Sequence, residues 1–159
     1  MIEASLVIIT KGPLTLLAEK KKGEIGIGTL NGSGGKLEPG ETLVECAIRE
    51  TDEELGLKLS PETLTKVAIV TAHVAGIPDF RVHVFRTEHF EGVVRETPEM
   101  IPSWHETDDL PYWRMLESDI EWFRKAATGE KFCANVYYRE RARGFERIEF
   151  LPFEDREDV

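Results

Sequence analysis

The sequence is short of cysteine and of basic charge, and both shortages narrow the class of protein. Its two cysteines, Cys46 and Cys133, have no CxxC spacing. They therefore form neither a zinc site nor a disulfide framework, and they fit a reducing compartment as small buried apolar residues. Acidic residues outnumber basic ones and give a net charge of −10. Such a chain repels long nucleic acids and acidic membrane surfaces, but a bound divalent cation can still bring a small phosphate ligand to it.

Long apolar runs are also missing. No run is long enough to cross a bilayer, and the first residues lack the basic start and the cleavage site of a signal peptide. We therefore expect a cytoplasmic protein. The 159 residues, 41% hydrophobic and 31% charged, suit a single domain that spans residues 1–159. The acidic tail after Pro152 is expected to fray.

Apolar and β-branched runs predict strands that are interspersed with two helices. The helices are expected over 43–55 and 118–128. The strands are expected over 4–10, 14–19, 66–74, 80–88, 100–104, 132–138 and 145–151. The stretch from Gly23 to Gly40 is rich in glycine and is expected to be irregular. This order predicts an α/β or α+β fold in which a mixed sheet has helices on its faces.

The first predicted helix has clear ends and two different faces. Thr42 can cap its N-terminus with Glu45 in a capping box, and Gly56 suits the left-handed residue that follows a helix. One face is formed by Val44, Ala47, Ile48, Thr51 and Leu55. Another face presents three acidic side chains, those of Glu50, Glu53 and Glu54.

Three carboxylates at spacings of three and four residues repel one another on a helix. A divalent cation removes this repulsion, and Mg²⁺ prefers such hard oxygen ligands. The alternative interpretation of an acidic triplet is a solvated helix face. The surrounding sequence decides between these two interpretations.

The residues around this helix have the spacing of a known motif. Gly35 is followed after five residues by Glu41, and after seven more by the run Arg49-Glu50-Thr51-Asp52-Glu53-Glu54-Leu55-Gly56-Leu57. This resembles the Nudix box, in which the order is glycine, glutamate, arginine-glutamate-aliphatic, glutamate-glutamate and glycine-aliphatic. All fixed residues are present, and Thr51 replaces one aliphatic residue. The chain is identified as a member of the Nudix family of metal-dependent pyrophosphohydrolases.

The resemblance implies roles for the residues of the box. The implied ligands of Mg²⁺, or of Mn²⁺, are the backbone carbonyl of Gly34 and the carboxylates of Glu50, Glu53, Glu54 and Glu99. Arg49 and Glu41 would pair and orient the carboxylates, and Lys36 would neutralise charge on the departing phosphate. The alternatives are a surface pair of Arg49 with Glu45 and a solvated Lys36. Gly35, Glu41 and Gly56 are implied to be structural.

Hydrolysis of a phosphoanhydride also needs a group that takes the proton of the attacking water. Glu50 is the favoured general base, and Glu53 and Glu99 are the alternatives. The implied catalytic set therefore consists of Lys36, Arg49, Glu50 and Glu53.

Further segments extend the resemblance over nearly the whole chain, toward the MutT-homologue branch that hydrolyses oxidised purine nucleoside triphosphates. These segments are LNGSGGKLEPGET, VHVFRTEHFEG, TPEMIPSW and LPYWRMLESDIEWF. The implied base-binding residues are Ser5, Asn31, Ser118 and Asp119. The implied substrate-binding residues also include Lys36, as a contact to the phosphates.

Three positions depart from that branch. Leu116 replaces a tryptophan that stacks on the base, Ser118 replaces a second acidic residue, and Thr71 replaces a pocket phenylalanine. Base–aromatic stacking contributes roughly 1–3 kcal/mol, so the departures bear on the substrate. Phe80 and Trp113 are the alternatives for a stacking surface.

The implied function is the Mg²⁺-dependent hydrolysis of a purine nucleoside triphosphate, such as 8-oxo-dGTP, to the monophosphate and pyrophosphate. One alternative is a Nudix hydrolase of another nucleotide, such as a different triphosphate or ADP-ribose. Another is a non-catalytic module that keeps the fold, and a third is an acidic structural protein. The expected partner is a nucleotide, without a long nucleic acid or a membrane, and the expected state is a monomer or small homo-oligomer.

Overall fold

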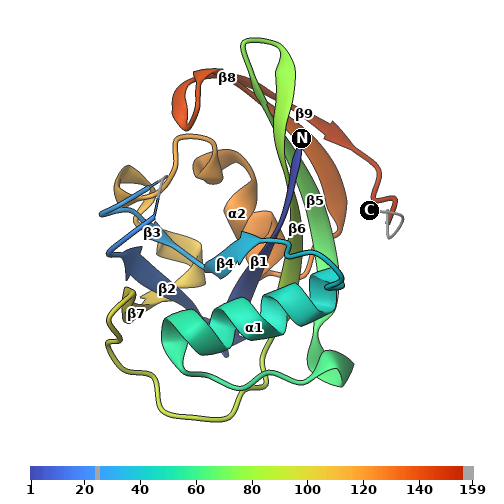
Figure 1. Ribbon diagram of the computed structural model, residues 1–159. Coiled ribbons are helices and arrows are strands. Elements are labelled where there is room, and N and C mark those ends of the chain that lie inside the picture. The colour runs from blue at the N-terminus through green and yellow to red at the C-terminus, as the bar shows by residue number, and fades with distance from the viewer. Residues whose placement is uncertain (24–25, 156–159) are drawn as a thin grey trace.

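A curled mixed sheet lies between two helices in the computed structural model, which describes residues 1–23 and 26–155 (Figure 1). In these ranges the strands are β1 (Ile2–Lys11), β2 (Leu14–Lys20), β3 (Leu30–Asn31), β4 (Ser33–Lys36), β5 (Thr65–Val74), β6 (Ile77–Thr87), β7 (Met100–Glu106), β8 (Phe132–Glu140) and β9 (Arg143–Leu151). The helices are α1 (Leu43–Leu55) and α2 (Asp119–Ala127), with short 3₁₀ turns η1 (Pro61–Thr63), η2 (Thr107–Asp109) and η3 (Tyr112–Arg114).

The strand order is β3-β2-β1-β6-β5-β8-β9, with β4 beside β1 and β7 beside β2. The pairs β1–β6 and β5–β8 are parallel and the others are antiparallel, so the sheet is mixed. This confirms the predicted fold class of a single domain with a mixed sheet and helices. No helix in the described ranges has both the length and the apolar character needed to cross a membrane.

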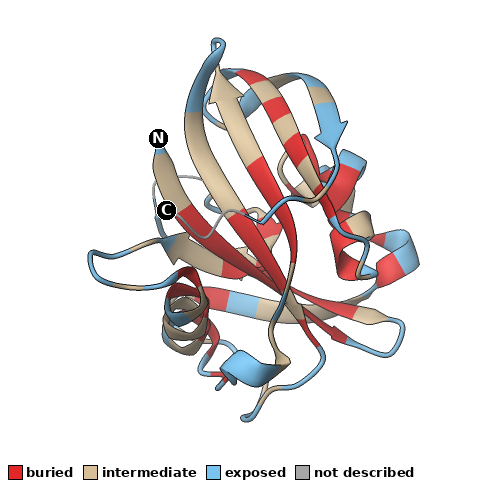
Figure 2. Cartoon of the chain, turned by 90° about the vertical axis from the view of Figure 1, so that its right-hand side faces the viewer, coloured by how far each residue is buried: buried red, intermediate tan, exposed pale blue. Residues whose placement is uncertain are grey.

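Strand β1 is buried on both faces, and its alternating side chains belong to two different cores. Leu6 and Ile8 pack in the cluster that includes Phe123 of α2, whereas Val7 and Ile9 pack in the cluster that contains the apolar residues of α1. Side chains alternate across a strand, so a run of consecutive apolar residues means that both faces are covered. The buried bands on the central strands are visible in Figure 2.

Helix α1 begins and ends where the local sequence predicts. The Thr42 hydroxyl accepts a hydrogen bond from the Glu45 N–H at 3.1 Å, and the Glu45 carboxylate accepts one from the Thr42 N–H at 2.9 Å. Gly56 has φ 69°, and its N–H donates to the Asp52 carbonyl. An N-cap of this kind contributes about 1 kcal/mol. The two caps fix where the helix begins and ends, and therefore the position of each glutamate on it.

The prediction that the stretch from Gly23 to Gly40 is irregular is wrong in part, because β3 and β4 lie in it. Strand β4 pairs with the first half of β1, with Leu6 opposite Gly34. A Cβ on Gly34 would lie 2.0 Å from the carbonyl oxygen of Ser5, so this close approach requires glycine. The long-range pairing places the glycine pair directly beside α1.

The acidic tail is anchored as far as it is described. Asp155 accepts a hydrogen bond from the Lys66 ammonium at 2.7 Å, and the Glu154 N–H lies 3.5 Å from the Cys133 sulfur. Residues 156–159 lie outside the described residues, so the expected fraying there stays a prediction. Both cysteines are free; Cys46 is buried and Cys133 is half-buried.

Candidate active site

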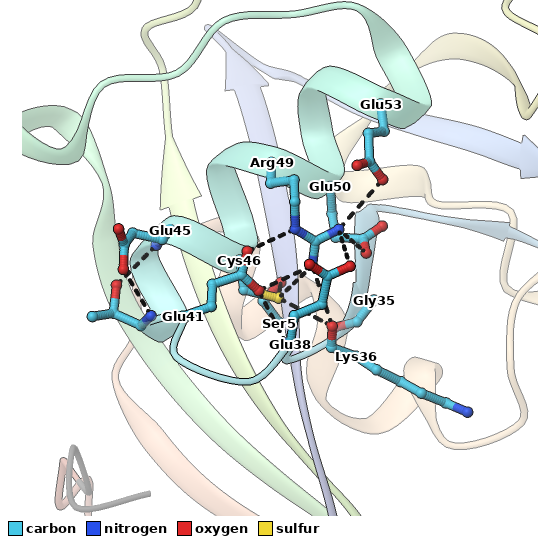
Figure 3. A network of polar contacts seen from close by, with 11 residues as sticks. Ser5, Gly35, Lys36, Glu38, Glu41, Glu45, Cys46, Arg49, Glu50 and Glu53 are labelled. Atoms are coloured by element: carbon cyan, nitrogen blue, oxygen red, sulfur yellow. Dashed lines mark hydrogen bonds and ion pairs between the residues drawn. The ribbon is translucent and has the colours of Figure 1, made fainter.

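Arg49 connects the loop before α1 to the acidic residues of the helix (Figure 3). Its Nε and Nη2 atoms donate to the two carboxylate oxygens of Glu41, at 2.6 and 3.0 Å. Its Nη1 atom lies 2.8 Å from Glu50 and 3.3 Å from Glu53. The hydrogen bonds from Arg49 hold the pKa of Glu41 below its usual value. The structure thus brings the predicted pair together, whereas Glu45 belongs to the capping box.

Glu54 does not lie on the exposed face with Glu53. It is 6% exposed, and its carboxylate accepts a hydrogen bond from the Gly34 N–H at 2.7 Å. The pKa of Glu54 is raised to about 8, chiefly by burial and also by the negative charges of Glu50 and Glu99, whereas the hydrogen bond from Gly34 and the charge of Lys20 lower it. Burial makes this carboxyl group costly to ionise, and a nearby cation would stabilise its charged form.

The acidic groups of this site act on one another electrostatically. Burial raises the pKa of Glu50, and the charges of Glu53 and Glu99 add to the effect, although hydrogen bonding to Arg49 lowers it. Within residues 1–23 and 26–155 no three acidic or histidine side chains are arranged as a ready-made metal shell. Glu50 and Glu53 accept hydrogen bonds from Arg49 instead, and Glu54 accepts one from the Gly34 N–H. This concentration of repelling carboxylates fits a hard divalent cation that would lie between them.

The departure at Thr51 has a structural explanation. Thr51 is fully buried, and its hydroxyl lies 2.7 Å from the hydroxyl of Ser33 on β4. A buried hydroxyl is tolerated when it is hydrogen-bonded. The polar pair therefore joins α1 to β4 where the motif usually has an apolar contact.

A cavity of about 220 Å³ extends from this site along the sheet toward α2. At one end it is lined by Gly34, Gly35 and Glu54. Its lining also includes all of the implied base-binding residues, namely Ser5, Asn31, Ser118 and Asp119. The structure therefore brings Glu54 and these four residues to one continuous space.

The two lysines near the site are placed differently. Lys36 is exposed, and its side chain extends away from the Arg49 network in Figure 3. Lys20, at the end of β2, lines the cavity and lowers the pKa of Glu54. Lys20 was not among the predicted site residues, because the predicted strand ended at Glu19, whereas β2 continues to Lys20.

At the other end, Asp119 and Ser118 are almost fully buried. Asp119 accepts a hydrogen bond from the Leu116 N–H at 3.1 Å, and burial raises the pKa of Asp119 to about 7. The Tyr138 hydroxyl donates to the Ser118 hydroxyl at 2.7 Å and accepts from the Ser118 N–H at 2.9 Å. Tyr138, which lines the cavity and was not among the predicted site residues, therefore fixes Ser118 beside Asp119.

Of the other residues predicted as base contacts or as stacking surfaces, all but Trp113 line the cavity. The Ser5 hydroxyl lies 3.3 Å from the Cys46 sulfur, and the Asn31 side-chain oxygen accepts a hydrogen bond from the Gly32 N–H at 2.8 Å. Leu116 and Phe80 line the cavity. Trp113 is 86% exposed and lies outside the lining, so it does not provide the alternative stacking surface.

The raised pKa of Asp119 predicts how stability depends on pH. The folded state binds the proton more tightly than the unfolded state, in which the pKa is about 3.9. The contribution of Asp119 to the free energy of unfolding should therefore fall by a few kcal/mol as pH rises from about 4 to 7, and then level off. In Asp119→Asn this contribution is absent, so the melting temperature of the variant relative to the wild type should rise over that interval. Melting curves between pH 4.5 and 8.5 measure this difference, and a constant difference would contradict the assignment.

The sheet between two helices, with a glycine turn beside a glutamate-bearing helix, defines the fold and the site of a Nudix domain. The family model described as "NUDIX domain" matches residues 3–126, and the chain belongs to this family. It is 36% identical over 138 residues to the oxidized purine nucleoside triphosphate hydrolase of Mus musculus, with 86% of each chain covered. It is 38% identical over 120 residues to the protein of the same name from Danio rerio, with 75% of each covered.

A solved structure agrees with this family assignment at the level of the fold. The MutT protein from Bacillus halodurans superposes with a TM-score of 0.78 and is 20% identical, covering 94% of this chain and 97% of that one. At this identity the likeness shows the fold.

Proposed function

We propose that the protein is a divalent-metal-dependent pyrophosphohydrolase that converts oxidised purine nucleoside triphosphates, such as 8-oxo-dGTP, to the monophosphate and pyrophosphate. The observation that carries this proposal is the cavity that joins Gly34, Gly35 and Glu54 to Asn31 and Asp119. Its glutamate end suits the phosphates with their cation, and its Asp119 end suits a base. The names of the mouse and zebrafish relatives support the substrate class.

In this proposal the glutamate cluster holds the cation. Its ligands would be Glu50, Glu53, Glu54 and Glu99, together with the carbonyl of Gly34. A bound Mg²⁺ or Mn²⁺ would neutralise charge on the phosphate oxygens and lower the pKa of the attacking water. Arg49 keeps Glu50 and Glu53 in place through its hydrogen bonds. Lys20 and Lys36 add positive charge for the departing phosphate.

Glu50 is the proposed general base. Burial raises the pKa of its carboxyl group, which increases its affinity for a proton. The absence of a side chain on Gly35 leaves room for that carboxylate, because a Cβ there would lie 2.5 Å from its carboxyl carbon. Glu53 and Glu99 remain the alternatives for this role.

The base would be recognised by Asn31 and Asp119, with Ser5 and Ser118 beside them. An amide both donates and accepts hydrogen bonds, and a carboxyl group can donate only when it is protonated. With a pKa of about 7, Asp119 exists in both forms at neutral pH. It can therefore either donate to a base carbonyl or accept from a base N–H.

A substrate panel tests the proposed function. With Mg²⁺ present, kcat/KM for 8-oxo-dGTP should exceed that for dGTP, dCTP and ADP-ribose, because Asp119 and Asn31 would recognise the edge of the oxidised purine. Hydrolysis in oxygen-18 water would show which phosphorus receives the new oxygen, and the products should be monophosphate and pyrophosphate. If ADP-ribose or the ordinary triphosphates react as well as 8-oxo-dGTP, the proposed substrate class is wrong. Cytoplasmic location, absence of nucleic-acid and membrane partners, and a monomeric or small oligomeric state belong to the same proposal.

A further inference from the structure

Residues from two hairpins line part of the cavity. Arg141, between β8 and β9, and Asp79 and Phe80, on β6, all belong to its lining. The Ala75 N–H donates to the Tyr138 carbonyl at 2.9 Å, so the two hairpins are joined by a hydrogen bond. In Figure 1 the β5–β6 and β8–β9 turns lie at the end of the molecule away from α1.

Asp79 and Phe80 hold the guanidinium of Arg141 in one orientation. Its Nε and Nη2 atoms donate to the two oxygens of Asp79, at 2.8 and 2.6 Å. Its central carbon lies 5.1 Å from the centre of the Phe80 ring, in a cation–π contact. A guanidinium fixed on both sides loses little further freedom when a ligand binds.

The guanidinium is also the flat group best placed to meet a base here. Leu116 has no ring, Trp113 lies outside the lining, and the Phe80 ring has Arg141 over it. Trp122 also belongs to the lining, but its ring is buried and packs against Phe123 and Phe132 in the core. Tyr138 is buried and is engaged through its hydroxyl with Ser118. A guanidinium plane stacks on nucleobases much as an aromatic ring does.

We propose that Arg141 is a specificity-determining residue whose guanidinium, held by Asp79 and Phe80, stacks on the purine ring of the substrate. The proposal rests on the proposed function, because the phosphates at the Glu54 end direct the base toward the hairpins. Purines have a larger ring surface than pyrimidines, so this contact favours purine nucleotides. Exposed ion pairs contribute little to stability, and the Arg141 side chain is 44% exposed, so its removal should leave the fold intact.

The test measures binding of the reaction products by calorimetry, which requires no turnover. For 8-oxo-dGMP, Arg141→Ala should raise the Kd by about tenfold, the size of one lost stacking contact, whereas the Kd for dCMP should change much less. Arg141→Lys keeps the charge but lacks the plane, so it should resemble Arg141→Ala. Asp79→Asn should give a smaller loss of the same kind, because it releases the guanidinium.

Arg147→Ala is the matched control. Arg147 also lies over an aromatic ring, with its central carbon 3.8 Å from the centre of the Tyr137 ring, but it is outside the cavity lining. Its removal should leave both Kd values unchanged. An unchanged Kd for 8-oxo-dGMP in Arg141→Ala, or an equal loss for 8-oxo-dGMP and dCMP, would overturn the inference while the wild type still hydrolyses 8-oxo-dGTP. A wild type that neither binds these products nor hydrolyses the triphosphate would overturn the proposed function and the inference with it.

Discussion

Replacing Glu53 by glutamine is expected to lower kcat by about 10²–10⁴-fold while the protein stays folded. The Glu53 side chain is 54% exposed and lies 3.3 Å from Arg49, so its charge is not needed by the core. The amide has nearly the same shape but cannot act as an anionic ligand or as a base. Steady-state hydrolysis of 8-oxo-dGTP measures the loss, and circular dichroism checks the fold.

Asp52→Asn is the matched control for Glu53→Gln. Asp52 is the neighbouring residue on α1, and its carboxylate forms an ion pair with Lys58 rather than with Arg49. The same chemical change should therefore leave kcat nearly unaltered. Equal activity of wild type and Glu53→Gln would remove Glu53 from the mechanism, and an equal loss in Asp52→Asn would point to a general effect of helix charge.

Replacing Gly35 by alanine is expected to remove most activity with only a small loss of stability. A Cβ at this position would lie 2.5–2.8 Å from the carboxyl atoms of Glu50. The end of a flexible side chain can move aside, so the fold survives, but the carboxylate leaves the position from which it acts. We expect kcat to fall by about 10²-fold or more, the size expected for a misplaced reacting group.

Gly34→Ala provides the contrast, because its Cβ would meet the backbone of β1 instead of a side chain. That variant should lose stability and expression along with activity. Thermal melts of the two variants beside kcat measurements distinguish the cases. Full activity in Gly35→Ala would show that the position of Glu50 next to Gly35 has no role in the reaction.

The elements predicted from the sequence were those with strong local signals. Helix α1 has a capping residue at one end, a glycine at the other and an amphipathic pattern between them, so its bounds follow from neighbouring residues. Strands β3 and β4 were missed because their pairing depends on contacts with β1 and β2 and on the side-chain-free approach of Gly34. Such pairing has no signature in the short strands themselves.

The site was predictable where the motif spacing sets it and less so where packing does. Arg49 meets Glu41 and Glu50 as expected. The helical pattern alone placed Glu54 on the same face as Glu53. Packing of β4 against α1 instead buries Glu54, whose carboxylate accepts a hydrogen bond from the Gly34 N–H. Lys20 and Arg141 come from distant strands and hairpins, so only the assembled sheet brings them to the cavity.

A titration of Mn²⁺ followed by electron paramagnetic resonance tests most directly whether the carboxylates of α1 bind a divalent cation. The wild-type protein should bind Mn²⁺, and Glu53→Gln should weaken this binding by at least tenfold, while Asp52→Asn should bind as the wild type does. Identical Mn²⁺ binding by the wild type and Glu53→Gln, or no binding by the wild type with nucleotide present, would contradict cation binding by these carboxylates.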